Sequence, residues 1–180
     1  PQAIEGNSMD IDMTLNVRPN ADFQLVIDPT VGDIIKGRGE GTLNLHINPR
    51  SNVFEMYGDY TITEGSYLFT LQNIINKRFI IENGSTIQWT GEPLDARLNI
   101  NAVYKLKTSL QPLIGTSVSS GGGDMNLNRA VPVECIINLS DRLTHPTVTF
   151  DVKVPTADAE YQTIIANTLN TQSAIAEQFM

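Results

Sequence analysis

The sequence predicts an all-β fold, and three observations support this prediction. Apolar residues stand at every second position through most of the chain, which is the period of a strand with one buried and one solvated face. The joints between these segments are short and rich in Asn, Gly, Ser and Pro, so consecutive strands are expected to pair antiparallel. The period changes to that of an amphipathic helix only after Pro155.

The alternation recurs in ten segments. In the first, Met9 to Val17, apolar residues occupy every odd position and polar residues lie between them. The ten segments are 9–17, 23–27, 43–47, 54–62, 67–71, 79–81, 87–89, 94–104, 131–139 and 148–154. Because successive side chains of a strand point to opposite faces, these segments predict a sheet with one apolar face and one polar face.

Tight joints connect the strands of the middle of the chain. Turn-forming residues cluster at 48–52, 63–66 and 90–93. Gly65 supplies a position for positive φ in the second cluster, and Asn83-Gly84 is the strongest two-residue hairpin signal, because a type I′ turn needs positive φ at both positions. These joints predict an antiparallel meander over residues 42–106 and leave no room for the crossover helices of a parallel sheet.

The rest of the chain is expected to complete a single β-rich domain over residues 1–180. Residues 107–130 lose the alternation and contain a Ser/Gly-rich run, which predicts a mobile loop. Residues 131–154 resume it as the last strands. Thr156 can then cap an amphipathic helix over 157–177, the one long helix expected in the chain.

Composition and charge exclude several classes of function. Acidic residues outnumber basic ones, 20 to 12, and give a net charge of −8 with a pI near 4.6. This balance would repel the phosphates of nucleic acids and of anionic membranes. No apolar run approaches the roughly 20 residues of a membrane helix. The chain begins at Pro1, without a signal peptide, and is expected to be a piece of a longer protein.

The acidic motifs do not predict a metal site. Asp10 and Asp12 form an Asp-x-Asp pair, but they lie on the polar face of a strict alternation, where acidic residues simply meet solvent. Residues 124–128 begin like a calcium loop, yet Arg129 stands where the loop needs glycine and Cys135 where it needs a carboxylate. No metal ligand set and no cofactor are therefore expected.

The chain also lacks the residue patterns of an enzyme. The single cysteine, Cys135, shares the parity of core residues, which predicts an inert buried thiol. His46 is placed on the polar side of its strand and His145 in a turn before Pro146, neither beside a recognisable nucleophile. Gly121 to Gly123 have no Lys-Ser or Lys-Thr after them and do not make a phosphate loop. We expect a protein without catalytic activity.

What remains as a functional feature is the apolar face. It can be sealed as the core of a stand-alone β-sandwich or barrel with a binding or adhesion role, or it can stay open to a ligand, and alternation alone fits both. A carbohydrate-binding module would need aromatic residues on the polar face, where Tyr57 is the clear example. Parity places Trp89 on the apolar face beside Ile87, Phe79 and Tyr67.

Several motifs between Gly39 and Phe179 resemble the C-terminal domain of the TamB family of AsmA-like envelope proteins. Residues 58–67 (GDYTITEGSY) are similar to its G-x-Y-x-(I/L)-x-x-G-x-Y unit, and residues 79–93 (FIIENGSTIQWTGEP) to its F-x-I-x-x-G-S-x-I-x-W-x-G-x-P signature. Residues 98–104 (LNINAVY) and 146–155 (PTVTFDVKVP) follow in the same order as in the family. Together, the order and spacing of these motifs are more specific than any one of them.

The resemblance implies a long antiparallel meander curled into an open trough, a β-taco, with an apolar concave side. It implies a periplasmic location in a Gram-negative bacterium, with the full-length chain anchored in the inner membrane. The implied roles are intermembrane lipid transport and outer-membrane protein assembly, with phospholipid acyl chains and an Omp85-type (TamA-like) barrel as partners. Lipid tails leave water without needing oriented hydrogen bonds, so an apolar trough suits them.

The expected lining of this trough consists of the apolar residues that share the inward parity, with Leu98 and Ile100 among its central positions. The full set is Leu43, Leu45, Ile47, Phe54, Met56, Tyr60, Ile62, Tyr67, Phe69, Leu71, Phe79, Ile81, Ile87, Trp89, Leu98, Ile100, Val133, Ile137, Val148, Phe150 and Val152. On the same face, Met9, Met13 and Met56 would add adaptable contacts.

Overall fold

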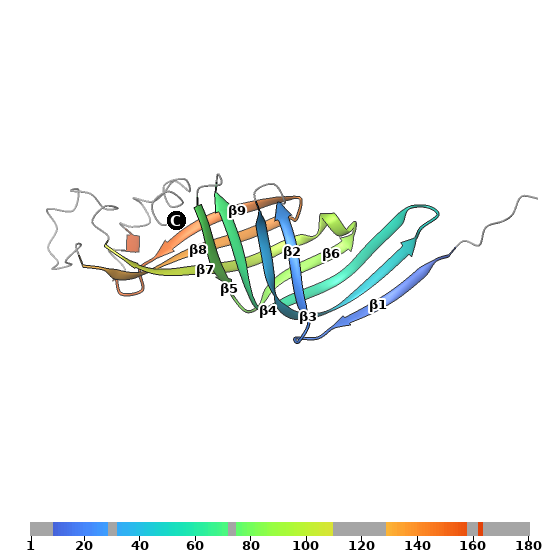
Figure 1. Cartoon of the computed structure of the whole chain (residues 1–180), viewed down its shortest axis with the longest axis horizontal. Helices are drawn as coiled ribbons and strands as arrows, with labels where there is room; N and C mark the ends of the chain where they lie inside the picture. Colours follow the sequence, from blue (N-terminus) through green and yellow to red (C-terminus); the bar gives the residue numbers. More distant parts are fainter. Residues whose placement is uncertain (1–8, 29–31, 72–74, 110–128, 158–161, 164–180) are drawn as a thin grey trace, which may run out of the picture.

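The computed structural model describes residues 9–28, 32–71, 75–109, 129–157 and 162–163, and these are nearly all β. Nine strands form one sheet in the order β1-β3-β4-β5-β7-β8-β9, with β2 paired to β3 and β6 paired to β4 and β7. Figure 1 labels β1 (Ile11–Val17), β2 (Asp22–Asp28), β3 (Asp33–Asn48), β4 (Val53–Leu71), β5 (Ile75–Ile81), β6 (Ser85–Gly91), β7 (Arg97–Thr108), β8 (Val131–Arg142) and β9 (His145–Lys153).

The all-β antiparallel meander predicted from the sequence is confirmed. Every strand pair in the described sheet is antiparallel, and β3, β4, β5 with β6, β7, β8 and β9 follow one another across it. The turn at 48–52 joins β3 to β4, with Asn52 at φ 55. The predicted helix over 157–177 lies outside the described residues except for 157, 162 and 163, and most of the predicted loop over 107–130 lies outside them too.

The turn predicted at residues 63–66 is wrong. β4 runs without interruption for 19 residues, and Gly65 has no positive φ. Arg38 pairs with Glu64 while Gly39 pairs with Ile62, so Thr63 is the extra residue of a β-bulge. The extra residue moves the inward parity from even to odd numbers, which keeps apolar residues on the core face both before and after it.

The predicted Asn83-Gly84 hairpin is also wrong. β5 and β6 do not pair with each other but lie in line, each antiparallel to a different half of β4. Residues 82–84 bulge between them, with Gly84 at φ 89. The Gly84 amide donates to the Ile62 carbonyl at 3.0 Å, and the buried Ser85 hydroxyl donates to the Glu82 carbonyl at 2.8 Å. These hydrogen bonds hold the joint in place, so β5 and β6 continue one line along β4 without forming a hairpin.

Two smaller differences concern strand ends. Residues 94–96 do not belong to the strand predicted over 94–104, because Pro93–Asp95 form a 3₁₀ turn and Leu94 is exposed. His145 is not in a turn but opens β9, opposite Arg142. The first difference follows from Pro93, which is favoured in the first turn of a helix and not inside a ladder.

The sheet bends along one line that passes between β1 and β2, through β3 and β4, and between β5 and β6. β1 and β2 lie in line against β3 and are separated at residues 18–21, at the level of the bulge at Thr63 and the gap at 82–84. Gly39 lies on this line, and a Cβ there would meet the Thr61 carbonyl oxygen and the Tyr60 ring. Bulges and glycines at one level let a long sheet change direction sharply.

The bend divides the sheet into an open part and a folded part (Figure 1). On one side, β1 and the β3–β4 hairpin extend from the body; we call β1 with residues 41–48 and 53–60 the arm. On the other side, β2 to β5 cross over β7 to β9 and pack on them: the Phe69 and Phe150 ring centroids lie 5.5 Å apart, and those of Phe79 and Tyr104 5.7 Å.

The folded part is possible because the sheet splits between β5 and β7. These strands pair only through Ile80 with Val103 and Ile81 with Ala102. Beyond that point they diverge. The sheet thus has two limbs, β2 to β5 and β7 to β9, which close on one core. The core residues are Ile35, Tyr60, Ile62, Tyr67, Phe69, Phe79, Ile81, Ile87, Ala96, Leu98, Ile100, Ala102, Val133, Cys135, Ile137, Leu139, Leu143, Val152 and Val154.

Candidate functional site

The strand register aligns the inward apolar residues in rows across the arm. The outermost row joins Ile11, Ile47 and Phe54. The next rows are Met13 with Leu45 and Met56, and then Leu15 with Leu43, Gly58 and Trp89. A further row, Val17 with Gly41, Tyr60, Ile87 and Leu98, reaches the body of the molecule. The apolar face is therefore continuous from the tip of the arm to the core.

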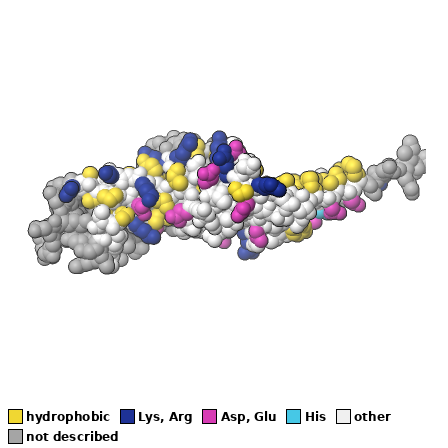
Figure 2. Space-filling view, turned by 90° about the horizontal axis from the view of Figure 1, so that it is seen from below, with side chains coloured by type: hydrophobic (Ala, Val, Ile, Leu, Met, Phe, Trp, Pro, Cys, Tyr) yellow, Lys and Arg dark blue, Asp and Glu magenta, His cyan; other side chains and the backbone are white. Residues whose placement is uncertain are grey.

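The apolar face is more exposed on the arm than at the bend. Phe54 and Met13 are each 46% exposed, and Leu15 is 45% exposed. Tyr60 and Leu98, near the bend, are 4% exposed, and Ile100 is fully buried. Figure 2 shows the consequence: hydrophobic side chains form a row along one side of the arm, and acidic side chains lie along the other. The trough is open at the arm and closed beyond the bend.

The expected trough lining divides between these two parts. Thirteen of its residues are buried: Leu43, Tyr60, Ile62, Tyr67, Phe69, Phe79, Ile81, Ile87, Leu98, Ile100, Val133, Ile137 and Val152. Leu45, Ile47, Met56, Trp89, Val148 and Phe150 are half-buried, and Phe54 is exposed. The side chain of Leu71 lies outside the described residues. Most of the buried residues lie beyond the bend, where the face is sealed as a core, but Leu43 and Tyr60 of the arm are buried too. The other arm residues of the set leave the face open.

An apolar cavity of about 600 Å³ lies where the arm meets the body. Leu43, Tyr60, Ile87 and Trp89 line it from β3, β4 and β6, and residues from the end of β1 to Leu25 of β2 complete it. The Trp89 indole donates from Nε1 to the Pro93 carbonyl at 3.1 Å, which holds the ring at the cavity. The expected placement of Trp89 on the apolar face is confirmed, because it packs against the core cluster.

The expected lining set omitted the residues that β1 and β2 contribute to this site, although Met13 was expected on the same face. Met13 and Leu15 carry much of the exposed apolar face, and Val17, Phe23 and Leu25 line the cavity. Their alternation is as strict as that of the later strands. The signal was therefore present, but the pairing of β1 and β2 with β3 was needed to place these residues beside the others.

The opposite face of the arm is polar and is paired across strands. Asp12 Oδ1 lies 2.8 Å from His46 Nδ1, and Asp10 accepts a hydrogen bond from the Asn48 side chain. The hydrogen bond to Asp12 raises the pKa of His46. Both carboxylates of the Asp-x-Asp pair are thus engaged within the sheet, and no cluster of metal-binding side chains occurs among the described residues.

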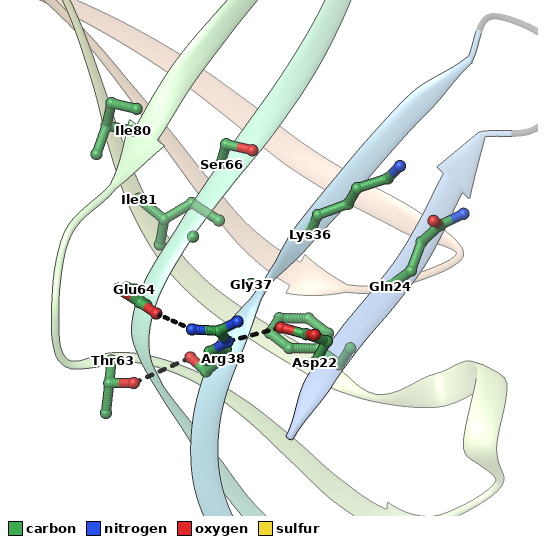
Figure 3. Close-up of a pocket in the computed structure, with 12 residues that line it drawn as sticks. Asp22, Gln24, Lys36, Gly37, Arg38, Thr63, Glu64, Ser66, Ile80 and Ile81 are labelled. Atoms are coloured by element: carbon green, nitrogen blue, oxygen red, sulfur yellow. Dashed lines mark hydrogen bonds and ion pairs between the residues drawn. The ribbon is translucent and has the colours of Figure 1, made fainter. Parts of the chain in front are cut away.

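A second hollow, of about 810 Å³, lies around Arg38 (Figure 3). Arg38 lies between two acids, 2.6 Å from Asp22 and 3.2 Å from Glu64, and the Thr63 hydroxyl donates to its carbonyl at 3.1 Å. Asp22 is the main cause that raises the pKa of Arg38. The charges of this hollow neutralise one another, so the apolar face is the stronger candidate.

A family model described as the TamB C-terminal domain matches residues 2–177, nearly the whole chain. Among curated proteins and solved structures, none matches significantly. Within the described part of the chain, no helix has the length and apolarity that crossing a bilayer would require.

Proposed function

The chain belongs to the TamB family, and we propose that its arm shields lipid acyl chains or hydrophobic outer-membrane clients from water. Proteins of this family belong to the Gram-negative cell envelope, where their broad role is in assembly and lipid transport. The proposal assigns that role, in this chain, to the open apolar face of β1, β3 and β4.

The observation that carries the proposal is a continuous apolar face left uncovered on three long strands. Met13, Leu15 and Phe54 remain nearly half exposed, although their cross-strand partners on the same face are half-buried or buried. Large uncovered apolar surfaces are costly in water, at about 25 cal/mol per Å², and are typical of surfaces that bind another molecule. The cavity at the base of the arm continues this face, so one end of such a ligand could lie inside it.

The proposal includes a non-enzymatic role. The buried thiol of Cys135 and the hydrogen-bonded side chains of the polar face support a role in binding without catalysis. The long apolar face of the arm suits an extended apolar ligand. We place this activity in the periplasm, in a longer chain anchored in the inner membrane. A TamA-like barrel of the Omp85 type is the outer-membrane partner that the family implies.

Photo-crosslinking from adjacent residues tests the proposal. A benzophenone amino acid replaces Met56, on the apolar face of the arm, or its neighbour Tyr57, which points to the polar face. In full-length protein in cells, we expect crosslinks to lipid or to outer-membrane protein from position 56 and few from position 57. Equal crosslinking from both positions, or none from position 56, would contradict the proposal.

A further inference from the structure

Two methionine thioethers lie on the open apolar face of the arm. Met13 of β1 and Met56 of β4 share one row, on either side of Leu45 of β3. Met13 is 46% exposed and Met56 is half-buried. The partner of Met56 on β6 is Gly91, which has no side chain to cover it. Because sulfur is the last atom but one of a methionine side chain, an uncovered methionine presents it to small molecules in solution.

These sulfurs are the reactive groups of the inward face of the arm. Apart from them and the phenol of Tyr60, which is buried, the inward residues of the described arm are hydrocarbons and glycines. The sulfur of Cys135, by contrast, belongs to a residue that is 2% exposed and lies in the core. The described sulfurs thus divide between an accessible set on the open face and an inaccessible one inside the fold.

Oxidation of a thioether by hydrogen peroxide needs only access to the sulfur. A sulfur lone pair attacks one peroxide oxygen, the S–O bond forms as the O–O bond breaks, and the leaving hydroxide takes the proton from the new S–OH group. The products are methionine sulfoxide and water, so the sulfur is oxidised by two electrons and the peroxide is reduced by two. An apolar side chain thereby becomes a polar one that carries a hydrogen-bond acceptor.

We propose that Met13 and Met56 form an oxidation site that controls the arm: peroxide converts both to sulfoxides, and the apolar face then loses affinity for acyl chains. The loss of affinity rests on the proposed function, whereas the oxidation itself does not. Two of the three side chains in the row become polar, and an acyl chain lying over them would separate their oxygens from water. Methionine sulfoxide reductases restore the thioether, so the change is reversible.

Peptide mapping by mass spectrometry tests the oxidation site. Native full-length protein is treated with hydrogen peroxide for increasing times and compared with protein treated in 6 M guanidinium. We expect Met13 and Met56 to gain one oxygen each in the native protein, while the buried Cys135 stays unmodified until the fold is lost. If Met13 and Met56 gain oxygen only in guanidinium, the oxidation site is refuted.

Crosslinking to lipid tests the effect on binding. The full-length protein is reconstituted in vesicles of phosphatidylethanolamine and phosphatidylglycerol, with a benzophenone amino acid at Ile47, in the next row of the arm. We expect crosslinking to lipid to fall about tenfold after peroxide, the order expected for covering an unpaired polar group. Treatment with methionine sulfoxide reductases should restore it.

Two variants assign the effect to this row. In the double variant Met13→Leu with Met56→Leu the row cannot be oxidised, so whatever crosslinking it shows before peroxide should survive the treatment. Met9→Leu is the matched control. Met9 is 59% exposed but lies outside the row, so this variant should remain as sensitive to peroxide as the wild type.

The outcomes distinguish the two proposals. An equal loss of crosslinking in the double variant, or no loss in the wild type once both methionines are oxidised, would overturn control by these sulfurs and leave the shielding of acyl chains standing. Absence of any crosslink to lipid from position 47 before peroxide would contradict the shielding itself, and peptide mapping would still decide whether the oxidation site exists.

Discussion

Cys135 illustrates what the position of a single residue determines. It lies on β8 opposite Tyr104 of β7 and Val152 of β9, and it is 2% exposed. Burial raises the pKa of its thiol to about 12. Since the thiolate is the reactive form, almost none is present near neutral pH. The sequence predicted a buried core thiol from parity alone, and the burial is confirmed.

We therefore expect Cys135 to resist alkylation in the folded protein. Iodoacetamide at pH 8 should leave the native chain unmodified over hours and label it fully in 6 M guanidinium. Intact-mass spectrometry measures both states. Labelling of the native protein at the rate of a free thiol would show that β8 opens readily, contrary to the burial of Cys135 in the core.

Irregularities shared by neighbouring strands shape the elements. The bulge at Thr63, the gap at 82–84 and the break at 18–21 lie at one level, and each would be a local defect in isolation. Together they let the apolar face pass from the open arm into the folded core. Gly39 lies on this line because the strands approach too closely there for a side chain.

Replacing Gly39 should therefore destabilise the bend. In Gly39→Ala the added Cβ meets the Thr61 carbonyl oxygen and the Tyr60 ring, and we expect a loss of about 1–3 kcal/mol in the free energy of unfolding. Glu40→Ala, at the exposed next position, is the control and should stay within about 0.5 kcal/mol of the wild type. Urea denaturation measures both; an unchanged midpoint in Gly39→Ala would refute the close approach.

At the scale of the whole molecule, one apolar face serves two purposes. Beyond the bend, β2 to β5 close over β7 to β9 and bury the face as a core. Along the arm no second layer covers it within the described residues, and the same kind of side chain remains at the surface. The stability of the fold and the capacity for binding thus come from different stretches of the same strands.

An aspartate should therefore destabilise the fold in one part and disturb only binding in the other. Ile100→Asp places a carboxylate in the fully buried core, which is too costly for a stable fold. Met56→Asp places it on the open arm, and we expect the melting temperature to change by no more than a few degrees while binding of acyl chains is lost. Thermal denaturation followed by circular dichroism tests this. Unfolding of both variants would show that the arm is also a sealed core.

The sequence predicted the strand content and the division into an apolar and a polar face, because the two-residue period of a strand is a local property. It left two points to the tertiary structure. A change of parity, as between Ile62 and Tyr67, can arise from a turn or from a bulge, and only the pairing with β3 identifies the bulge. Asn83-Gly84 has the composition of a hairpin, yet its flanking strands both find a partner in β4.

Membership in the TamB family and an apolar face were determined by the residues themselves, through their order, spacing and alternation. Which part of that face is open was decided by the tertiary structure alone. Phe54 and Ile100 obey the same alternation, but one is 46% exposed and the other is buried. The physical reason is that exposure depends on a second layer of strands distant in the sequence, and only the bend and the split between β5 and β7 bring that layer into place.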